Sequence, residues 1–305
     1  MSNPAVEICN VTKRFGQHTA VDDLNLTVPS GTIYGFIGPN GSGKSTTLRM
    51  IMRILHPDQG SIRVLGSEQL DAANDRVGYL PEERGLYKKM KVVEILHFFA
   101  RIKGKKQSLP AIMQWLERME LAEWANKPVE ALSKGMSQKV QFIAAVIAEP
   151  ELVILDEPFS GLDPVNAVVL REAVLELKKA GRTVIFSTHD MSVAEKMCDV
   201  IFMIYKGKKV LDGPLNEIQD AYGSDTIRVR LEEGQVVKDA LPGVEQIADF
   251  GRWQELRLIN QHDTQAVLNA LMRQGRVRHF ELARPSLHDI FLRVVGVDEG
   301  ELVGK

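Results

Sequence analysis

Gly38-Pro-Asn-Gly-Ser-Gly-Lys-Ser45 is the stretch that decides the fold, because it fits the phosphate-loop pattern G-x-x-x-x-G-K-[ST]. The glycines let the backbone curl so that successive N–H groups point at phosphate oxygens. Lys44 adds a positive charge near the β- and γ-phosphates, and the hydroxyl of Ser45 is a hard oxygen ligand suited to Mg²⁺. This stretch predicts a loop that holds nucleotide phosphates.

The residues on either side place this loop between a strand and a helix. Residues 32–37 form an apolar run typical of a buried strand, and residues 46–55 indicate a helix. The positive end of the helix dipole then faces the phosphates, which favours anion binding. The candidate nucleotide-binding residues of the segment are Gly38, Pro39, Asn40, Gly41, Ser42, Gly43, Lys44, Ser45 and Thr46.

Two adjacent carboxylates end a second apolar run. Residues 152–155 are four aliphatic residues, as expected for a parallel strand buried on both faces, and Asp156 and Glu157 follow them directly. Ligands of open α/β sheets bind beyond the carboxyl ends of the strands. The pair therefore indicates a functional site, although strand-end carboxylates can also simply face water.

A third segment, Leu132-Ser-Lys-Gly-Met-Ser-Gln-Lys139, precedes that strand. Alone it is weak evidence, because a serine before an apolar helix is often only an N-cap. Together with the other two segments it resembles the nucleotide-binding subunits of ABC (ATP-binding cassette) systems over about residues 5–215. The family signature is usually LSGGQ: Ser133 and Gly135 match it, whereas Lys134 and Met136 do not.

The resemblance implies an α/β fold: a P-loop NTPase cassette with a RecA-like core, an antiparallel β-subdomain and a helical subdomain at about 85–131. It also implies roles for single residues. Asp156 would hold Mg²⁺, usually through water, and Glu157 would polarise the attacking water. His189, after the apolar run 183–186, matches the switch histidine that contacts the γ-phosphate, although a lone histidine is more often structural.

Three further positions match the family less simply. Asp163 lies in Ser160-Gly-Leu-Asp-Pro164, a segment that resembles the D-loop, which contacts a partner subunit in the family. Asp163 is also a candidate N-cap for a helix at 165–180. Phe15 stands where an aromatic ring stacks on adenine, but it could equally pack in the core. Glu82 stands where most members have glutamine; its carboxylate can also bind Mg²⁺ but adds negative charge.

Composition agrees with a globular intracellular protein. Hydrophobic residues make up 44% and charged residues 26% of the 305 residues, and the formal net charge of −2 argues against a general nucleic-acid-binding surface. The chain has only Cys9 and Cys198, without a C-x-x-C pair, so neither a disulfide framework nor a zinc site is indicated. No secretory signal is visible, and no run approaches the ~18 apolar residues of a membrane span.

The segment 222–305 predicts a small α+β accessory domain after a cassette at 1–220. Strands are expected at 225–231, 253–259 and 277–283, and helices at 264–273 and 285–293. The wording Pro285-Ser-Leu-His-Asp-Ile-Phe resembles the C-terminal extension of ATPases that power ABC-2-type exporters, including sodium-extrusion and antibiotic-resistance systems. His262, His279 and His288 are not spaced like metal ligands.

The resulting hypothesis is an ATPase subunit of an ABC exporter that uses ATP and Mg²⁺. Two copies would form a head-to-tail homodimer, with each nucleotide between the phosphate loop of one copy and residues 133–136 of the other. The expected partner is an integral membrane permease subunit, which places the chain in the cytoplasm, peripherally on the cytoplasmic face of the membrane; no nucleic-acid partner is expected. The alternatives are a soluble ABC ATPase acting on ribosomes or DNA, and a nucleotide sensor without turnover.

Overall fold

The protein is described from a computed structural model that covers residues 3–68, 76–83, 85–105, 108–223, 226–232, 236–237, 241–251, 253–259 and 264–296. The chain divides into two compact units, Met1–Pro214 and Leu215–Lys305. Each unit has its own cluster of buried aliphatic and aromatic side chains. The two units are therefore described separately.

The first unit is built on a six-stranded sheet. Its strands are parallel except for the last, which runs antiparallel at one edge. Every residue of β3, β6 and β7 is buried, as the continuous apolar runs predicted. In spatial order the strands are β5 (Val77–Leu80), β6 (Leu152–Asp156), β7 (Thr183–Thr188), β3 (Ile33–Ile37), β8 (Val200–Tyr205) and β9 (Lys208–Pro214).

A second, antiparallel sheet in this unit has the order β2-β1-β4. Its strands are β1 (Val6–Phe15), β2 (His18–Val28) and β4 (Gln59–Val64). The pairing of β1 with β2 shifts register after Ile8, which interrupts the polar–apolar alternation that marks a strand in sequence. The fold class predicted from the sequence, a cassette with a parallel core and an antiparallel β-subdomain, is confirmed.

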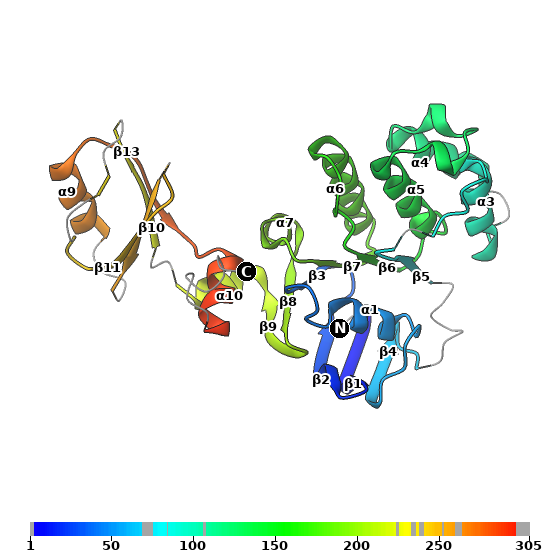
Figure 1. The fold of residues 1–305 in the computed structure, drawn as a ribbon, viewed down its shortest axis with the longest axis horizontal. Coiled ribbons are helices and arrows are strands. Elements are labelled where there is room, and N and C mark those ends of the chain that lie inside the picture. Colours follow the sequence, from blue (N-terminus) through cyan, green and yellow to red (C-terminus); the bar gives the residue numbers. More distant parts are fainter. Residues whose placement is uncertain are drawn as a thin grey trace. The chain divides into compact units, whose positions relative to one another are not determined.

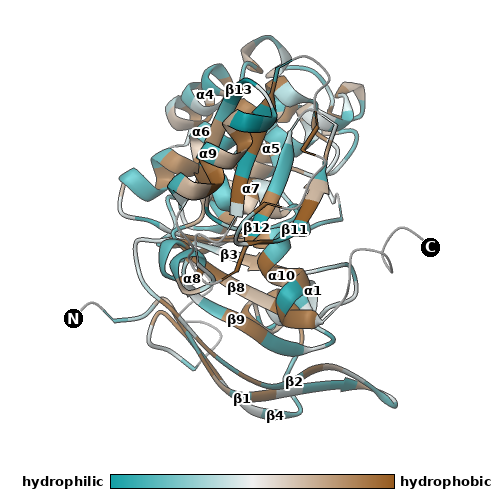
Figure 2. Ribbon diagram, turned by 90° about the vertical axis from the view of Figure 1, so that its left-hand side faces the viewer, coloured by the Kyte–Doolittle hydropathy of each residue, from teal (hydrophilic) through white to brown (hydrophobic). Residues whose placement is uncertain are grey.

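Helices surround the central sheet. Figure 1 shows α3, α4 and α5 gathered beside the edge formed by β5, and Figure 2 shows brown and teal residues mixed along the helices, as expected where one face is buried. The helix after the phosphate loop ends earlier than expected, because Arg53 has a positive φ of 53°. The elements are α1 (Lys44–Ile51), α3 (Val92–Ile102), α4 (Leu109–Arg118), η1 (Ala122–Trp124), η2 (Val129–Ala131), α5 (Lys134–Val146), α6 (Pro164–Lys179) and α7 (Met191–Met197).

The second unit packs α9 against a four-stranded antiparallel sheet of order β11-β12-β10-β13. One strand, β11, carries no strong sequence signal and had not been expected. The strands are β10 (Thr226–Leu231), β11 (Val244–Asp249), β12 (Gln254–Leu258) and β13 (Val277–Ala283); the helices are α8 (Leu215–Ala221), α9 (Thr264–Gln274) and α10 (Leu287–Val295). Within the described residues, no helix of either unit is long and apolar enough to cross a membrane.

Helix α8 belongs to the second unit, so the division falls after Pro214 and not after the residue 220 used above. The amide Nε2 of Gln219 donates to the carbonyl of Pro285 at 3.3 Å. At the other end, Arg293 Nη1 donates to the carbonyl of Tyr222, also at 3.3 Å. These bonds tie α8 to the segment around α10, a long-range pairing that the sequence does not display.

The two separate cores predict that a chain ending after Pro214 folds and binds ATP with nearly the affinity of the full chain. Titration calorimetry of the shortened chain against the full chain checks this expectation. A chain ending at residue 222 is the matched comparison, because it keeps Leu215 and Ile218 of α8, which are buried in the full chain. It is expected to aggregate more and melt earlier. A soluble 1–214 chain that fails to bind ATP would contradict the boundary.

Candidate functional site

The phosphate loop has a backbone that only glycine permits at its tightest points. Gly43 adopts φ +111°, and a Cβ there would lie 2.5 Å from the carbonyl oxygen of Ala20. A Cβ on Gly38 would lie 2.2 Å from the carbonyl oxygen of Ile204. The loop is therefore pressed against the segments carrying Ala20 and Ile204, which fixes its curvature before any ligand arrives.

Lys44 opens α1 and turns its ammonium group back over the loop. Its Nζ donates to the carbonyl oxygens of Gly38 at 2.7 Å and Pro39 at 3.1 Å, and lies 4.0 Å from Oε1 of Glu157. Burial lowers the pKa of Lys44, and the neighbouring carboxylates of Glu157, Asp156 and Glu82 oppose that shift. The loop therefore holds a buried cation among carboxylates, at a place where phosphate oxygens can replace the two carbonyl acceptors.

Asp156 ends β6 and is fully buried. Its Oδ1 accepts hydrogen bonds from the hydroxyls of Ser45 at 3.1 Å and Ser187 at 2.5 Å. Its Oδ2 is buried and has no hydrogen-bond partner. A buried carboxylate oxygen without a partner is costly unless something binds it, and beside the Ser45 hydroxyl a divalent cation fits that need.

Protein side chains alone do not complete a metal site at this point. Within the described parts of the chain, no group of three or more histidine, cysteine, aspartate or glutamate side chains is placed to hold a metal ion. Mg²⁺ commonly keeps several waters and takes its remaining oxygens from substrate phosphates. The donor set of Ser45 and Asp156 fits this kind of shared site.

Glu157 follows Asp156 with its backbone in the left-handed region, at φ 49°. In this conformation the backbone leaves the extended geometry of β6. Oε1 of Glu157 lies 3.0 Å from Nδ1 of His189. Glu157 is 9% exposed, whereas the His189 side chain is 54% exposed. A nearly buried carboxylate thus meets a histidine that reaches solvent.

These groups surround one open cavity of about 360 Å³. The phosphate loop forms one wall, Glu157 lies at the base of the charged region, and Glu82 contributes a carboxylate. The ring of Phe15 is 48% exposed and lies under Nζ of Lys13, which is 5.6 Å from the ring centroid, so Phe15 is not a core residue. The lining residues are Phe15, His18, Ala20, Asn40, Gly41, Ser42, Gly43, Lys44, Ser45, Thr46, Glu82 and Glu157.

Sequence reasoning missed three residues at this site. His18 and Ala20 line the cavity from the start of β2, and their only signal was their position just after Phe15. Ser187 was visible only as part of a strand, since its place beside Asp156 depends on the register of β6 against β7.

The signature-like segment is not among the residues that line this cavity. Ser133 caps α5, its Oγ accepting from the N–H of Met136 at 3.2 Å, and Lys134, Gly135 and Met136 form the first turn of that helix. Asp163 likewise caps α6, its Oδ1 accepting from Val165 and Asn166 at 3.1 and 3.0 Å. Ser133 and Asp163 are therefore both helix N-caps, as the sequence also suggested. Neither residue lines the cavity.

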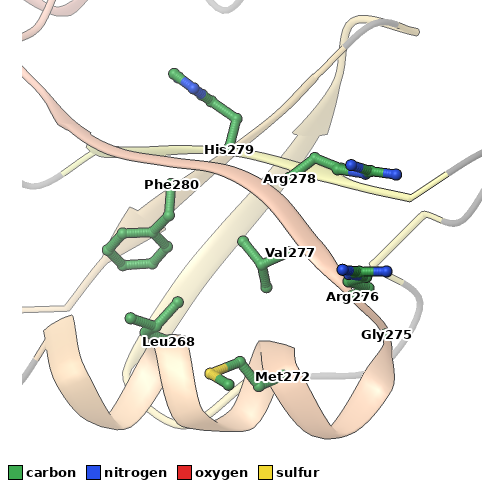
Figure 3. Close-up of a pocket in the computed structure, with 8 residues that line it drawn as sticks. All are labelled: Leu268, Met272, Gly275, Arg276, Val277, Arg278, His279 and Phe280. Atoms are coloured by element: carbon green, nitrogen blue, oxygen red, sulfur yellow. The ribbon is translucent and has the colours of Figure 1, made fainter.

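The second unit has a groove of its own, of about 580 Å³, between α9 and β13. Figure 3 shows Leu268 and Met272 of α9 directed toward Val277 and Phe280 of β13, while His279 points away from the helix. Arg278 pairs with Glu232. The groove has an apolar floor and lacks the carboxylate and hydroxyl set of the smaller cavity, so the chemistry lies in the first unit.

Comparisons with known proteins agree with this geometry. The ABC transporter family profile matches residues 21–160. An uncharacterized ABC transporter ATP-binding protein, YhaQ of Bacillus subtilis (strain 168), is 43% identical over 95% of this chain and 98% of its own length. The chain belongs to the ABC transporter ATP-binding proteins. It therefore carries an ATP-binding cassette of the kind that hydrolyses ATP for transport and works with membrane subunits.

Other relatives of this ABC protein cover both units. Nod factor export ATP-binding protein I of Cupriavidus metallidurans is 33% identical over 95% of this chain and 97% of that protein. Daunorubicin resistance ATP-binding protein DrrA3 of Streptomyces coeruleorubidus is 31% identical over 98% of each chain. A profile described as the DrrA1-3-like C-terminal domain matches residues 213–295. A solved ATP-binding subunit of an ABC transporter has a TM-score of 0.66 at 30% identity, over 72% of this chain and 93% of that chain.

Gly43→Ala should abolish tight ATP binding, because the added Cβ would press on the backbone of Ala20 and strain a left-handed position. We expect at least ~100-fold weaker binding by calorimetry, equivalent to ~2.7 kcal/mol. Gly41→Ala is the matched control: its φ is +75°, but nothing lies within 4 Å of the added Cβ. It should lose at most ~30-fold, from backbone strain of ~1–2 kcal/mol. Equal losses in both variants would contradict the close-approach argument.

Proposed function

We propose that this chain is the ATPase subunit of an ABC exporter, and that it couples ATP binding and hydrolysis to a separate membrane permease subunit. The observation that carries the proposal is the convergence of Lys44, Ser45, Asp156 and Glu157 around one cavity. The names of two relatives, for Nod factor export and daunorubicin resistance, support the export direction. None of the relatives named above is described as acting on ribosomes or DNA.

Within this proposal the phosphate loop binds the triphosphate through its backbone N–H groups and Lys44. Ser45 and Asp156 hold Mg²⁺, with Asp156 presenting the buried Oδ2 that has no protein partner. When bound, Mg²⁺ neutralises charge on the phosphate oxygens. Phe15, on the exposed side of the cavity, is placed to stack on the base, and Glu82 contributes oxygen near the metal.

Glu157 orients and polarises the attacking water in this proposal. Its carboxylate accepts a hydrogen bond from that water, and burial at 9% exposure limits competition from bulk solvent. His189 contacts Oε1 of Glu157 through Nδ1 at 3.0 Å. Because half of the histidine side chain reaches solvent, it is free to turn toward a γ-phosphate.

A second copy of the chain completes the site. Residues 133–136 contribute no lining to the cavity of their own chain, and the cavity is open on one side. We infer a head-to-tail homodimer in which these residues, together with Asp163, face the nucleotide held by the other copy. ATP binds the closed dimer more tightly than the open chains, so it favours closure, and hydrolysis releases it.

The permease contact is proposed on the helical subdomain. Tyr87 and Ile102 are large exposed apolar residues there, and the ring of Tyr87 meets Phe98 edge-on with 6.0 Å between centroids. Contiguous exposed apolar residues of this kind often mark protein interfaces. This partner would hold the chain at the cytoplasmic face of the membrane.

Glu157→Gln tests the catalytic assignment. The amide keeps the size and an acceptor oxygen but removes the charge that polarises water, so kcat should fall ~10²–10⁴-fold with little change in KM. Steady-state ATPase assays measure both constants. Size exclusion with ATP and Mg²⁺ should show the variant accumulating as a dimer.

Lys44→Ala is the comparison for Glu157→Gln. It removes a phosphate contact, so it should lose ATP binding and stay monomeric under the same conditions. Near-normal turnover of Glu157→Gln, with no dimer trapped by ATP, would remove Glu157 from the catalytic role.

Ile102→Glu tests the permease surface. Ile102 is 61% exposed, so the charge should leave the fold and ATP binding intact while weakening co-purification with the membrane partner by ~10-fold or more. Ile54→Glu, at a side chain 57% exposed outside the helical subdomain, is the control and should leave the complex intact. Quantitative pull-down from membranes measures both. Equal recovery of the permease with the two variants would contradict this surface.

A further inference from the structure

Ser187 occupies a buried position between the carboxylate of Asp156 and the backbone of Glu157. It is the fifth residue of β7, is fully buried, and pairs in parallel register with Asp156 of β6. A serine one residue before the carboxyl end of β7 places a hydroxyl where the sheet meets the cavity. Such a buried hydroxyl needs hydrogen-bond partners to offset its lost hydration.

The Ser187 hydroxyl makes two hydrogen bonds of opposite sense. It donates to Oδ1 of Asp156 at 2.5 Å and accepts from the backbone N–H of Glu157 at 2.9 Å. A hydroxyl can donate to one neighbour and accept from the other through its single oxygen. The two bonds join the side chain of one carboxylate residue to the backbone of the next.

Each bond fixes a feature that the proposed chemistry requires. The bond to Asp156 engages Oδ1, which Ser45 also contacts, and leaves Oδ2 as the oxygen without a partner. The bond from Glu157 holds the start of a non-glycine residue in the left-handed region, at φ 49°. That conformation costs ~1–2 kcal/mol, so it persists only where surrounding contacts impose it.

We propose that Ser187 is a positioning residue that sets the Asp156 carboxylate for Mg²⁺ and the Glu157 backbone for water activation at the same time. This inference rests on the ATPase function proposed above and adds a residue to it. Ser187 touches neither the nucleotide nor the water; it acts through its two neighbours. Loss of its hydroxyl should therefore disturb the metal and the turnover together, while ATP binding without metal stays intact.

The test compares Ser187→Ala, Ser187→Thr and Thr183→Ala in the full chain. Alanine removes both hydrogen bonds, whereas threonine keeps the hydroxyl. Thr183 is the matched control, because it is also buried on β7 and its Oγ1 accepts from the N–H of Gly31 at 2.9 Å, at the opposite end of the strand. Thr183→Ala thus reports what the loss of one buried hydroxyl bond does to stability alone.

The expected results separate positioning from a structural role. Ser187→Ala should lower kcat ~10-fold or more and raise the Mg²⁺ concentration for half-maximal activity ~3–10-fold, with KM for ATP changed less than ~2-fold. Calorimetry should show unchanged ATP binding without Mg²⁺ and a smaller gain on adding Mg²⁺. Ser187→Thr should recover most of both readouts, and Thr183→Ala should melt earlier but keep the Mg²⁺ dependence of wild type.

Three outcomes would overturn the proposal: wild-type Mg²⁺ dependence in Ser187→Ala, the same Mg²⁺ shift in Thr183→Ala, or a folded Ser187→Thr as impaired as the alanine variant. Failure of the proposed function looks different, because wild type itself would then show no ATP turnover. In that case the Mg²⁺-dependent gain in ATP binding, compared between wild type and Ser187→Ala, still decides the role of Ser187.

Discussion

The site depends on an unbalanced group of charges at the carboxyl edge of the central sheet. Lys44 is the buried cation, and Glu157, Asp156 and Glu82 are close enough to affect its pKa. Asp156 and Glu157 are buried beside this ammonium, whereas Glu82 is exposed, so the buried carboxylates outnumber the buried cation, and a triphosphate adds more negative charge. Buried charge of one sign is costly unless it is paired. A divalent cation at Asp156 would relieve this excess, so in the proposed function the charge balance makes nucleotide binding and metal binding interdependent.

The parallel sheet makes that concentration of charge possible. Strands β3, β6 and β7 run in the same direction and are hydrogen-bonded in register, so the residues after Ile37, Asp156 and Thr188 emerge at one edge. All three strands are buried along their length, which holds this edge rigid. The phosphate loop, the carboxylate pair and His189 come from segments far apart in the chain. They meet because sheet register, and not sequence proximity, sets their positions.

The sequence alone predicts those parts of the molecule in which one contiguous motif determines one local structure. The phosphate loop, the apolar strand before Asp156 and the helix at Thr264–Gln274 can each be predicted from residue spacing alone. The sequence does not predict features that depend on contacts between segments far apart in the chain. The contact of Ser187 with Asp156 depends on the pairing of two strands. The assignment of α8 to the second unit depends on bonds such as Gln219 to Pro285, across 66 residues.

Helix α5, which begins in the signature-like segment 133–136, offers a physical link between the two nucleotide sites of the proposed dimer. Gln138, buried in α5, donates through Nε2 to the carbonyl of Pro158 at 3.1 Å, directly after Glu157. A Cβ on Gly135, in the first turn of α5, would lie 3.3 Å from Nδ2 of Asn166 on α6. The start of α5 is thus held against both the Glu157–Pro158 segment and α6 of its own chain. In the proposed dimer, that end of α5 faces the nucleotide of the other copy, while Glu157 faces its own. A movement of α5 on meeting one nucleotide would therefore reach the Glu157 segment beside the other, which gives the two half-sites a direct physical connection.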